Sequence, residues 1–415
     1  MVEGRTPEAV VFPGSIDEVR AVVELAAAAG VPVIPWGGGT AAHVGAPPAT
    51  PRPALVLALG RLNRLLEHEP GDLTATVEAG MTMAALQAAL GARGQWLSLD
   101  PPDAERATIG GVIAANAAGP RRHLYGTARD LVLGLRIVTA DGALVRGGGK
   151  VVKNVAGYDV PKLLIGSWGT LGVIVEVTLK LRPRPDEERL VAVPFERLKD
   201  AGAAVRAIAG SDLIPAAVEL LDAEASATLG LPRPGGGTLV VGFDGFADQV
   251  RWQCEELARV VTPLGGRDVL ALPADAWGRL ARAARDAQPD PAALMKLVVL
   301  PAAVAETMEQ GAAAARQRGL RSAWSASAGV GVVSAALFAP AGPPAVERVA
   351  AVLTEWRRLA RAAGGHAVLE RAPLAVKSVV PVWDDPGPAG RLMQRIKAEL
   401  DPRHLFNPGR FVAGI

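Results

Sequence analysis

Near its start the chain carries apolar residues at helical spacing. The positions that share one helical face are Ile16, Val19, Val23 and either Ala26 or Ala27. Ser15 and Glu18 form a capping box, in which the serine hydroxyl accepts from a backbone N–H of the first turn. Gly30 suits the left-handed residue that follows a helix. We therefore predict a helix over residues 16–29 and a strand over residues 31–35.

Alternating and continuous apolar runs predict a series of strands up to residue 181. They cover residues 55–59, 73–79, 133–140, 143–146 and 173–181. Thr82 is placed to cap a helix that runs through Leu90, and a short helix is expected at residues 161–165. Asp141-Gly142 is typical of a two-residue type I′ hairpin turn.

The pattern changes after Arg182-Pro183-Arg184-Pro185, which we interpret as a domain boundary. Strands are predicted at residues 191–194, 217–221, 238–243 and 294–300 and within residues 323–338. Helices are predicted at residues 198–209, 248–261, 346–363 and 388–400. Two strand–helix–strand passes over an antiparallel sheet describe a ferredoxin-like α+β layer.

Composition indicates a globular protein of two or three domains. Half of the 415 residues are hydrophobic, and the net charge of +2 gives no electrostatic footprint for nucleic acid. Cys254 is the only cysteine, which excludes an intrachain disulfide, a cysteine-ligated zinc site and an iron–sulfur cluster held by this chain alone. The first residues do not resemble a signal peptide, and the uncharged run at 322–346 is broken by glycine and proline. We expect a cytoplasmic protein with no metal site.

Two segments are too rich in glycine and alanine for ordinary core elements. Residues 109–119 remove side-chain bulk, so that backbone can lie directly against a flat or anionic ligand. Residues 37–42 formally fit the nicotinamide dinucleotide fingerprint, but prolines follow where that fingerprint needs a helix. A loop whose successive amides bind an anion fits better, and a plain glycine turn remains the alternative.

The order of the motifs carries a resemblance. The motifs are Trp36-Gly37-Gly38-Gly39-Thr40, Asp100-Pro101-Pro102, Thr108-Ile109-Gly110-Gly111, Asn116-Ala117-Ala118-Gly119, Tyr125-Gly126, the Asp141-Gly142 hairpin, Gly157-Tyr158-Asp159, Gly166-Ser167-x-Gly169-Thr170-Leu171-Gly172 and Asn407-Pro408-Gly409-Arg410. In this order they resemble the vanillyl-alcohol-oxidase (PCMH-type) FAD flavoproteins, and within them the FAD-binding E subunits of bacterial glycolate oxidases. The resemblance covers about residues 8–185 and the last ~45 residues.

The resemblance implies an α+β fold in which a PCMH-type FAD-binding domain of two subdomains carries an inserted ferredoxin-like cap. The implied domains are residues 1–185 for the FAD-binding domain, 186–365 for the cap and 366–415 for a segment that returns to the FAD domain. Carried over by motif, the cofactor-binding residues are Gly37, Gly38, Gly39, Thr40, Thr108, Ile109, Gly110, Gly111, Ala114, Asn116, Gly119, Gly169, Thr170, Gly172, Ile174 and Asn407. The residues alone favour a core strand residue at Ile174 and a turn former at Asn407.

Two departures from the family pattern bear on catalysis. The related D subunits and D-lactate dehydrogenases carry a histidine-rich motif after the cap, whereas residues 365–373 here keep only His366. Trp168 stands where those relatives usually have glutamate. Both departures fit the E subunit. Covalent flavin attachment in this superfamily uses a histidine or cysteine, but His43 is not at the expected position and Cys254 lies in the predicted cap, so we expect non-covalent FAD.

The implied reaction is oxidation of a 2-hydroxy acid, glycolate to glyoxylate, by hydride transfer to flavin N5. Arg371 and Lys377 are candidates to hold the substrate carboxylate and His366 to act as base, although the residues alone favour a solvated or core-edge position for each. Arg121, Arg122 and His123 are weaker candidates.

The resemblance implies electron transfer to partners, a catalytic flavoprotein D subunit and an iron–sulfur F subunit, with at most peripheral attachment to the inner face of the membrane. A free-standing FAD-dependent 2-hydroxy-acid dehydrogenase and a non-catalytic FAD-binding assembly subunit stay open as alternatives.

Overall fold

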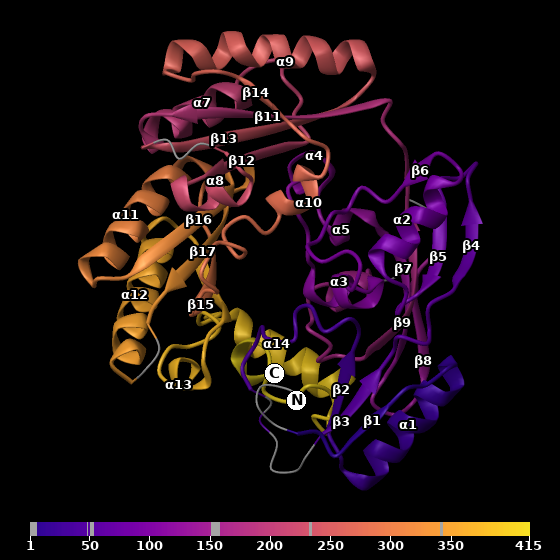
Figure 1. Ribbon diagram of the computed structural model, residues 1–415. Helices are drawn as coiled ribbons and strands as arrows, with labels where there is room; N and C mark the ends of the chain where they lie inside the picture. The colour runs from indigo at the N-terminus through magenta and orange to yellow at the C-terminus, as the bar shows by residue number, and fades with distance from the viewer. Residues whose placement is uncertain (1–5, 48, 50–53, 151–157, 232–234, 341–342) are drawn as a thin grey trace. The chain divides into compact units, whose positions relative to one another are not determined.

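The computed structural model describes residues 6–47, 49, 54–150, 158–231, 235–340 and 343–415, so Gly157 of the Gly-Tyr-Asp motif lies outside the described residues. The chain divides into two compact units, each drawn in Figure 1. The first unit comprises residues 1–119, 126–184 and 385–415, and the second comprises residues 120–125 and 185–384.

The return to the first unit comes later than the sequence suggests. We predicted it at residue 366, but strand β18 (His366–Arg371) pairs with β15 (Ala293–Val298) inside the second unit. The chain therefore completes the sheet of the second unit before it leaves, and the return follows Asp384.

A small parallel sheet begins the first unit. Its strand order is β1-β3-β2, and α1 covers it through Val19, Val23 and Ala26. The predicted Ser15 and Gly30 caps of α1 are confirmed, since the Ser15 hydroxyl accepts from the Glu18 amide at 3.2 Å and Gly30 has φ +63°. The Glu18 carboxylate accepts from the Gly14 amide at 2.6 Å and not from the Ser15 amide, so only half of the predicted capping box forms. The elements are β1 (Ala9–Val11), α1 (Ile16–Ala29), β2 (Val33–Trp36) and β3 (Leu55–Ala58).

A five-stranded antiparallel sheet forms the rest of the first unit, in the order β4-β5-β9-β7-β8, and a two-stranded ladder joins β10 and β6. Helices α2 and α3 pack their apolar residues on the five-stranded sheet. The strands are β4 (Leu65–Glu69), β5 (Thr74–Glu78), β6 (Gln95–Trp96), β7 (Val132–Val138), β8 (Leu144–Gly148), β9 (Val173–Lys180) and β10 (Arg182–Pro183). The helices are α2 (Met83–Gly91), α3 (Ile109–Ala115), α5 (Ala128–Leu131), α6 (Pro161–Leu164) and α14 (Ala389–Leu400).

The hairpin between β7 and β8 differs from the predicted type I′ turn. That turn needs positive φ at both central residues, but here Gly142 has positive φ and Asp141 does not. The Asp141 carboxylate accepts hydrogen bonds from the Thr139 hydroxyl and the Ala143 amide. The Gly142 amide also donates to the Thr139 carbonyl at 2.9 Å, so the connection is longer and is held by the aspartate side chain.

The second unit contains one eight-stranded antiparallel sheet built from two similar halves. Its order is β14-β11-β13-β12-β16-β17-β15-β18. Each half runs strand–helix–strand–strand–helix–strand and places its fourth strand at the outer edge, which is the ferredoxin-like arrangement that the sequence predicted. The strands are β11 (Glu187–Phe195), β12 (Ala217–Leu221), β13 (Gly237–Gly245), β14 (Leu270–Leu272), β15 (Ala293–Val298), β16 (Arg321–Ser327), β17 (Val332–Phe338) and β18 (His366–Arg371).

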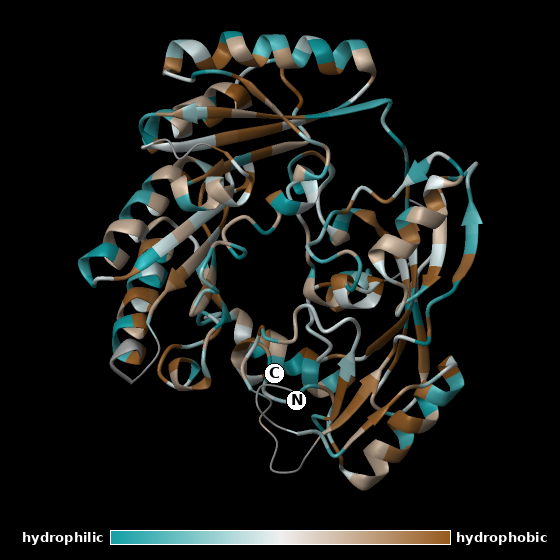
Figure 2. Cartoon of the chain, viewed as in Figure 1, coloured by the Kyte–Doolittle hydropathy of each residue, from teal (hydrophilic) through white to brown (hydrophobic). Residues whose placement is uncertain are grey.

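Four long helices cover one face of this sheet and enclose the main core, in which Trp324 and Trp356 meet edge to face at 4.7 Å between ring centroids. Helices α8 and α10 pack on the opposite face. Figure 2 shows apolar and polar residues alternating along α9, as an amphipathic helix requires. The helices are α4 (Arg122–Tyr125), α7 (Leu198–Ala209), α8 (Ala223–Thr228), α9 (Ala247–Val261), α10 (Ala276–Leu280), α11 (Val304–Gln317), α12 (Pro343–Ala362) and α13 (Leu374–Lys377).

No helix among the described residues is both long enough and apolar enough to cross a lipid bilayer.

A buried ion pair fixes the C-terminal segment of the first unit. The Lys397 ammonium donates to the Asp401 carboxylate at 2.6 Å, to the Thr170 carbonyl at 2.6 Å and to the Phe406 carbonyl at 3.0 Å. Asp401 also accepts from the amides of Leu405 and Phe406, both at 2.8 Å. Burial lowers the pKa of Lys397, and the bond to Asp401 opposes that shift.

We predict that Lys397→Met lowers the free energy of unfolding by about 3–5 kcal/mol, because it leaves the Asp401 carboxylate buried without its cation. Lys150→Met is the matched control, since Lys150 pairs with Glu67 near the surface and the change should cost under about 1 kcal/mol. Urea unfolding of both variants tests this. Equal losses in the two variants would contradict it.

A second prediction concerns Asp222, which caps α8 by accepting from the Ala225 amide at 2.8 Å. Burial raises the pKa of Asp222 from 3.8 to about 7. The carboxyl therefore stays protonated in the folded chain between about pH 4 and 7, where it ionises in the unfolded chain. The contribution of Asp222 to the free energy of unfolding is therefore most favourable below about pH 4, and it is lost as the pH rises to about 7.

Asp222→Asn keeps the cap and removes the titration. A shift of about three units corresponds to about 4 kcal/mol, and the partial exposure of Asp222 reduces this to about 2 kcal/mol. We expect the stability of the variant relative to the parent to increase by that amount between pH 4 and 8. Urea unfolding at both pH values measures it, and parallel pH profiles would rule it out.

Candidate functional site

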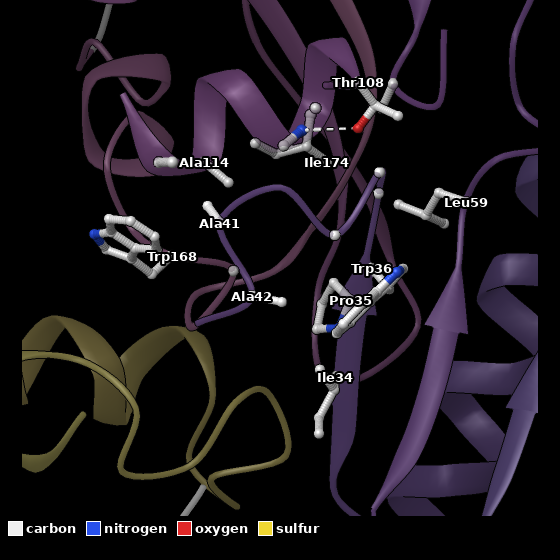
Figure 3. Close-up of a pocket in the computed structure, with 18 of the residues that line it drawn as sticks. Ile34, Pro35, Trp36, Ala41, Ala42, Leu59, Thr108, Ala114, Trp168 and Ile174 are labelled. Carbon is white, nitrogen blue, oxygen red and sulfur yellow. Dashed lines mark hydrogen bonds between the residues drawn. The ribbon is translucent and has the colours of Figure 1, made fainter. Parts of the chain in front are cut away.

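A pocket in the first unit collects the glycine-rich segments (Figure 3). Its walls come from the end of β2, the first glycine loop (residues 37–42), helix α3, the second glycine loop (residues 166–172), strand β9 and the C-terminal tail (residues 401–410). The lining residues are Ile34, Pro35, Trp36, Gly37, Gly38, Gly39, Thr40, Ala41, Ala42, Leu59, Ala79, Thr108, Gly110, Gly111, Ala114, Ala115, Trp168, Gly169, Gly172, Ile174, Asn407 and Arg410.

The first glycine loop offers a row of backbone donors. Among the described residues, the amides of residues 37–41 find no hydrogen-bond acceptor in the chain. Gly39 has φ +71°, a left-handed conformation that turns successive amides toward a common point. Gly38 packs closely on the loop that leads into helix α3. A Cβ added to Gly38 would lie 1.7 Å from the Arg106 carbonyl oxygen of that loop. The loop is therefore fixed in place and its amides remain available to an anion.

Helix α3 forms a second wall of the pocket, in a segment that the sequence analysis judged too rich in glycine and alanine for an ordinary core element. The Thr108 hydroxyl caps it by accepting from the Gly111 amide at 3.3 Å (Figure 3). Its large side chains are buried in the core at Ile109, Val112 and Ile113. The small residues therefore remain on the face toward the pocket, where they leave room for a flat ligand.

The second glycine loop and the C-terminal tail close the pocket together. The Asn407 side-chain amide donates to the carbonyl of Trp168 at 2.9 Å and to that of Gly169 at 3.4 Å. The Trp168 amide donates in turn to the carbonyl of Ala114 at 2.8 Å, which joins the loop to α3. Asn407 Oδ1 is buried and has no hydrogen-bond partner among the described residues, so it is an acceptor for a ligand donor.

Most of the predicted cofactor residues meet in this pocket. Twelve line it: Gly37, Gly38, Gly39, Thr40, Thr108, Gly110, Gly111, Ala114, Gly169, Gly172, Ile174 and Asn407. Four do not. Ile109 is a core residue, and the buried Thr170 hydroxyl donates to the Ser167 carbonyl at 2.7 Å. Asn116 caps the end of α3, and the Gly119 amide donates to Asp100 at 3.1 Å.

Sequence reasoning missed several lining residues. Pro35 and Trp36 directly precede the first glycine loop, and Trp168 lies inside the second, so adjacency to the motifs could have identified them. Leu59 and Ala79 come from positions just beyond β3 and β5, and nothing in the sequence marks them. Arg410 closes the Asn-Pro-Gly-Arg motif, and its charge was the available signal.

The candidate catalytic residues lie in the second unit and do not form one cluster. His366 begins β18 and is exposed, whereas Arg371 ends the same strand. Five residues along a strand span roughly 16 Å. The Arg371 guanidinium is already engaged, because it donates to Asp290 at 3.0 Å and to the Pro291 carbonyl at 3.1 Å. Lys377 ends α13 and is buried.

The weaker candidates belong to residues 120–125 of the second unit. Arg121 is buried, binds Asp244 at 2.8 Å and Glu188 at 3.0 Å, and stacks over the Trp277 ring at 3.9 Å. The Tyr125 hydroxyl donates to the same Asp244 carboxylate at 2.6 Å. The Arg121 charge is thus engaged by two carboxylates, and burial lowers the pKa of His123.

Cys254 is half-buried on α9 in the second unit, and burial raises the pKa of its thiol. A raised pKa leaves less of the reactive thiolate at neutral pH. Within the described ranges, no three or more histidine, cysteine, aspartate or glutamate side chains gather closely enough to hold a metal ion.

Curated relatives match part of the chain. It is 35% identical over 260 residues to "Glycolate oxidase subunit GlcD" of Bacillus subtilis, covering 61% of this chain and 55% of that protein. It is 36% identical over 270 residues to "D-lactate dehydrogenase" of Archaeoglobus fulgidus, covering 63% of this chain and 58% of that protein. It is 46% identical over 122 residues to "Glycolate oxidase subunit GlcE" of Escherichia coli, covering 29% of this chain and 35% of that protein. The chain thus matches between 35% and 58% of the length of these relatives.

Solved structures share the fold. p-Cresol methylhydroxylase with substrate bound superposes with a TM-score of 0.78 at 17% identity, over 98% of this chain and 88% of that one. The expected PCMH-type α+β fold is thereby confirmed, and at this identity the likeness concerns the fold alone.

Two family models account for most of the sequence. The model "FAD binding domain" matches residues 7–148, and the model "FAD linked oxidases, C-terminal domain" matches residues 184–370 and 384–411. The pocket is built largely from the first region. Trp168, Gly169, Gly172 and Ile174 between the two regions and the end of the second region complete it. The chain therefore belongs to the FAD-linked oxidases, a family of flavin-dependent oxidoreductases.

Proposed function

We propose that the pocket of the first unit holds FAD without a covalent bond. The unengaged amides of residues 37–41 suit the oxygens of a diphosphate, and the small residues of α3 suit a planar ring. The buried Asn407 Oδ1 suits a hydroxyl or amino donor, which FAD carries on its ribose, ribityl chain and adenine. The observation that carries the proposal is this match between unpartnered polar groups and the groups that FAD offers.

We propose further that the protein oxidises a 2-hydroxy acid, with glycolate as the first candidate. FAD, when bound, accepts the hydride that leaves the α-carbon of the substrate. The names of the relatives, glycolate oxidase subunits and a D-lactate dehydrogenase, support this substrate class. His366 remains the proposed base, and Arg371 and Lys377 remain the proposed groups for the carboxylate.

A second function, that of an electron-transfer or assembly subunit, is favoured by one observation. His366 and Arg371 lie at opposite ends of β18, whereas the hydroxyl and carboxylate of glycolate sit on adjacent carbons. One glycolate cannot contact both side chains at once. Under this second function, the chain is the FAD-binding E subunit of a glycolate oxidase complex, in which a D-type flavoprotein carries the substrate site.

An iron–sulfur subunit would complete that complex, since the single cysteine of this chain cannot hold a cluster by itself. We propose a cytoplasmic location, with at most peripheral contact with the inner membrane face through partners. Co-purification of the tagged chain from its native cells tests the complex. Recovery of the chain without partners, at full yield and with full glycolate-oxidising activity, would contradict the proposed complex.

The visible spectrum of the purified chain with anaerobic glycolate separates the two functions. Flavin bands near 370 and 450 nm are expected for oxidised bound FAD, about one per chain, and acid precipitation should release the flavin into the supernatant. Bleaching of the longer band by glycolate indicates a chain that oxidises substrate itself. A yellow protein that does not bleach indicates an electron-transfer or assembly subunit, and a colourless chain that takes up no FAD contradicts both functions.

We predict that Gly38→Ala lowers FAD affinity by about tenfold to hundredfold, because the new methyl group pushes the loop away from Arg106. Gly60→Ala is the matched control, because a Cβ there meets nothing within 4 Å. Fluorescence titration of the apoproteins with FAD gives both affinities. The proposed role of the loop fails if the Gly38 variant binds as tightly as the control.

A further inference from the structure

One residue distinguishes the pocket electrostatically. Among the described residues that line it, Arg410 alone is charged, and none carries a carboxylate. The diphosphate of FAD carries about two negative charges at neutral pH. Backbone amides can accommodate phosphate oxygens by hydrogen bonding, but they contribute only partial charges. A full positive charge inside the same pocket therefore attracts a diphosphate more strongly than the amides do alone.

Arg410 is held firmly at the end of the first glycine loop. Its guanidinium donates to the Ala42 carbonyl, the last residue of that loop. Its own carbonyl accepts from the Ala46 amide at 3.1 Å, and its amide donates to the Asn407 carbonyl at 3.2 Å. Only 5% of the residue is exposed, so the side chain is fixed beside the loop.

The packing around Arg410 leaves little freedom for another arrangement. A Cβ added to Gly45 would lie 2.8 Å from Arg410 Cγ, so the chain runs directly over the arginine stem there. A guanidinium has five N–H donors in a planar fork. The bond to Ala42 uses one of its nitrogens, and the fork is therefore oriented by the same loop whose amides line the pocket.

We propose that Arg410 is the charge partner of the FAD diphosphate, binding it together with the amides of the first glycine loop. The inference rests on the proposal that this pocket holds FAD. A buried, oriented guanidinium matches the geometry of phosphate oxygens, and charge-assisted bonds of this kind are stronger than those from neutral donors. Arg410 acts by binding and does not take part in the oxidation.

Three variants separate charge from packing. Arg410→Gln keeps a donor for the Ala42 carbonyl but loses the charge, whereas Arg410→Lys keeps the charge. Arg403→Gln is the matched control, because Arg403 lies on the same tail and donates at 3.0 Å to the Ala27 carbonyl, outside the pocket. Circular dichroism of each apoprotein confirms that it is folded.

Titration calorimetry with FAD, ADP and adenosine gives the readout. We expect Arg410→Gln to weaken FAD and ADP binding by about 30-fold and adenosine binding by less than about threefold, because adenosine has no phosphate. Arg410→Lys should stay within about fivefold of the parent and Arg403→Gln within about twofold. The affinity of the parent for ADP should fall as salt rises from 0.05 to 0.5 M, more steeply than that of Arg410→Gln.

Several results would overturn the inference: equal ADP affinity in the parent and Arg410→Gln, equal losses for ADP and adenosine, or a lysine variant as weak as the glutamine variant. If Arg410→Gln does not fold, the salt dependence of the parent and of Arg410→Lys decides, and a flat dependence in both overturns it. A parent chain that binds neither FAD nor ADP refutes the FAD site itself. Tight binding by the parent and by Arg410→Gln alike refutes only the role of Arg410.

Discussion

The buried ammonium of Lys397 is the interaction on which the architecture of the pocket depends. It joins α14 to the second glycine loop through the Thr170 carbonyl and to the C-terminal tail through Asp401 and Phe406. Asn407 then follows Phe406 directly and bonds back to the second glycine loop. Because a buried cation is costly without partners, the fully bonded Lys397 strongly favours the one arrangement in which loop and tail meet.

The walls of the pocket suit a dianion because they are almost free of charge. Amides and small side chains provide directional donors without the repulsion or desolvation that a ring of ionised groups would bring. A single arginine at the end of the first glycine loop then adds a charge in a defined position. The directional donors thus come from the path of the backbone, and the glycines matter chiefly for the close approaches that they permit.

Local signals in the sequence located much of the fold. The capped helix α1 and the bounds of α7 and β12 follow from periodicity alone. Helix α11 escaped notice because its buried face consists largely of alanine and Gly311, which leaves room for the Trp324 ring and gives little apolar contrast. Helix α3 escaped because glycines lower helix propensity, whereas the Thr108 cap and the burial of three large residues outweigh that cost. Pocket residues outside the glycine motifs, such as Leu59, depend on long-range packing that no local pattern reveals.

The topology of the second unit limits how this chain could act on a substrate. The two ferredoxin-like halves join through β12 and β16, which makes β18 an edge strand of the combined sheet. His366 and Arg371 occupy the two ends of that strand and are separated by its full length. A base and a carboxylate clamp for one small hydroxy acid must lie within a few ångströms of each other. If His366 is the base, the group that holds the substrate carboxylate must come from an element other than β18. If Arg371 holds the carboxylate, the base must come from an element other than β18.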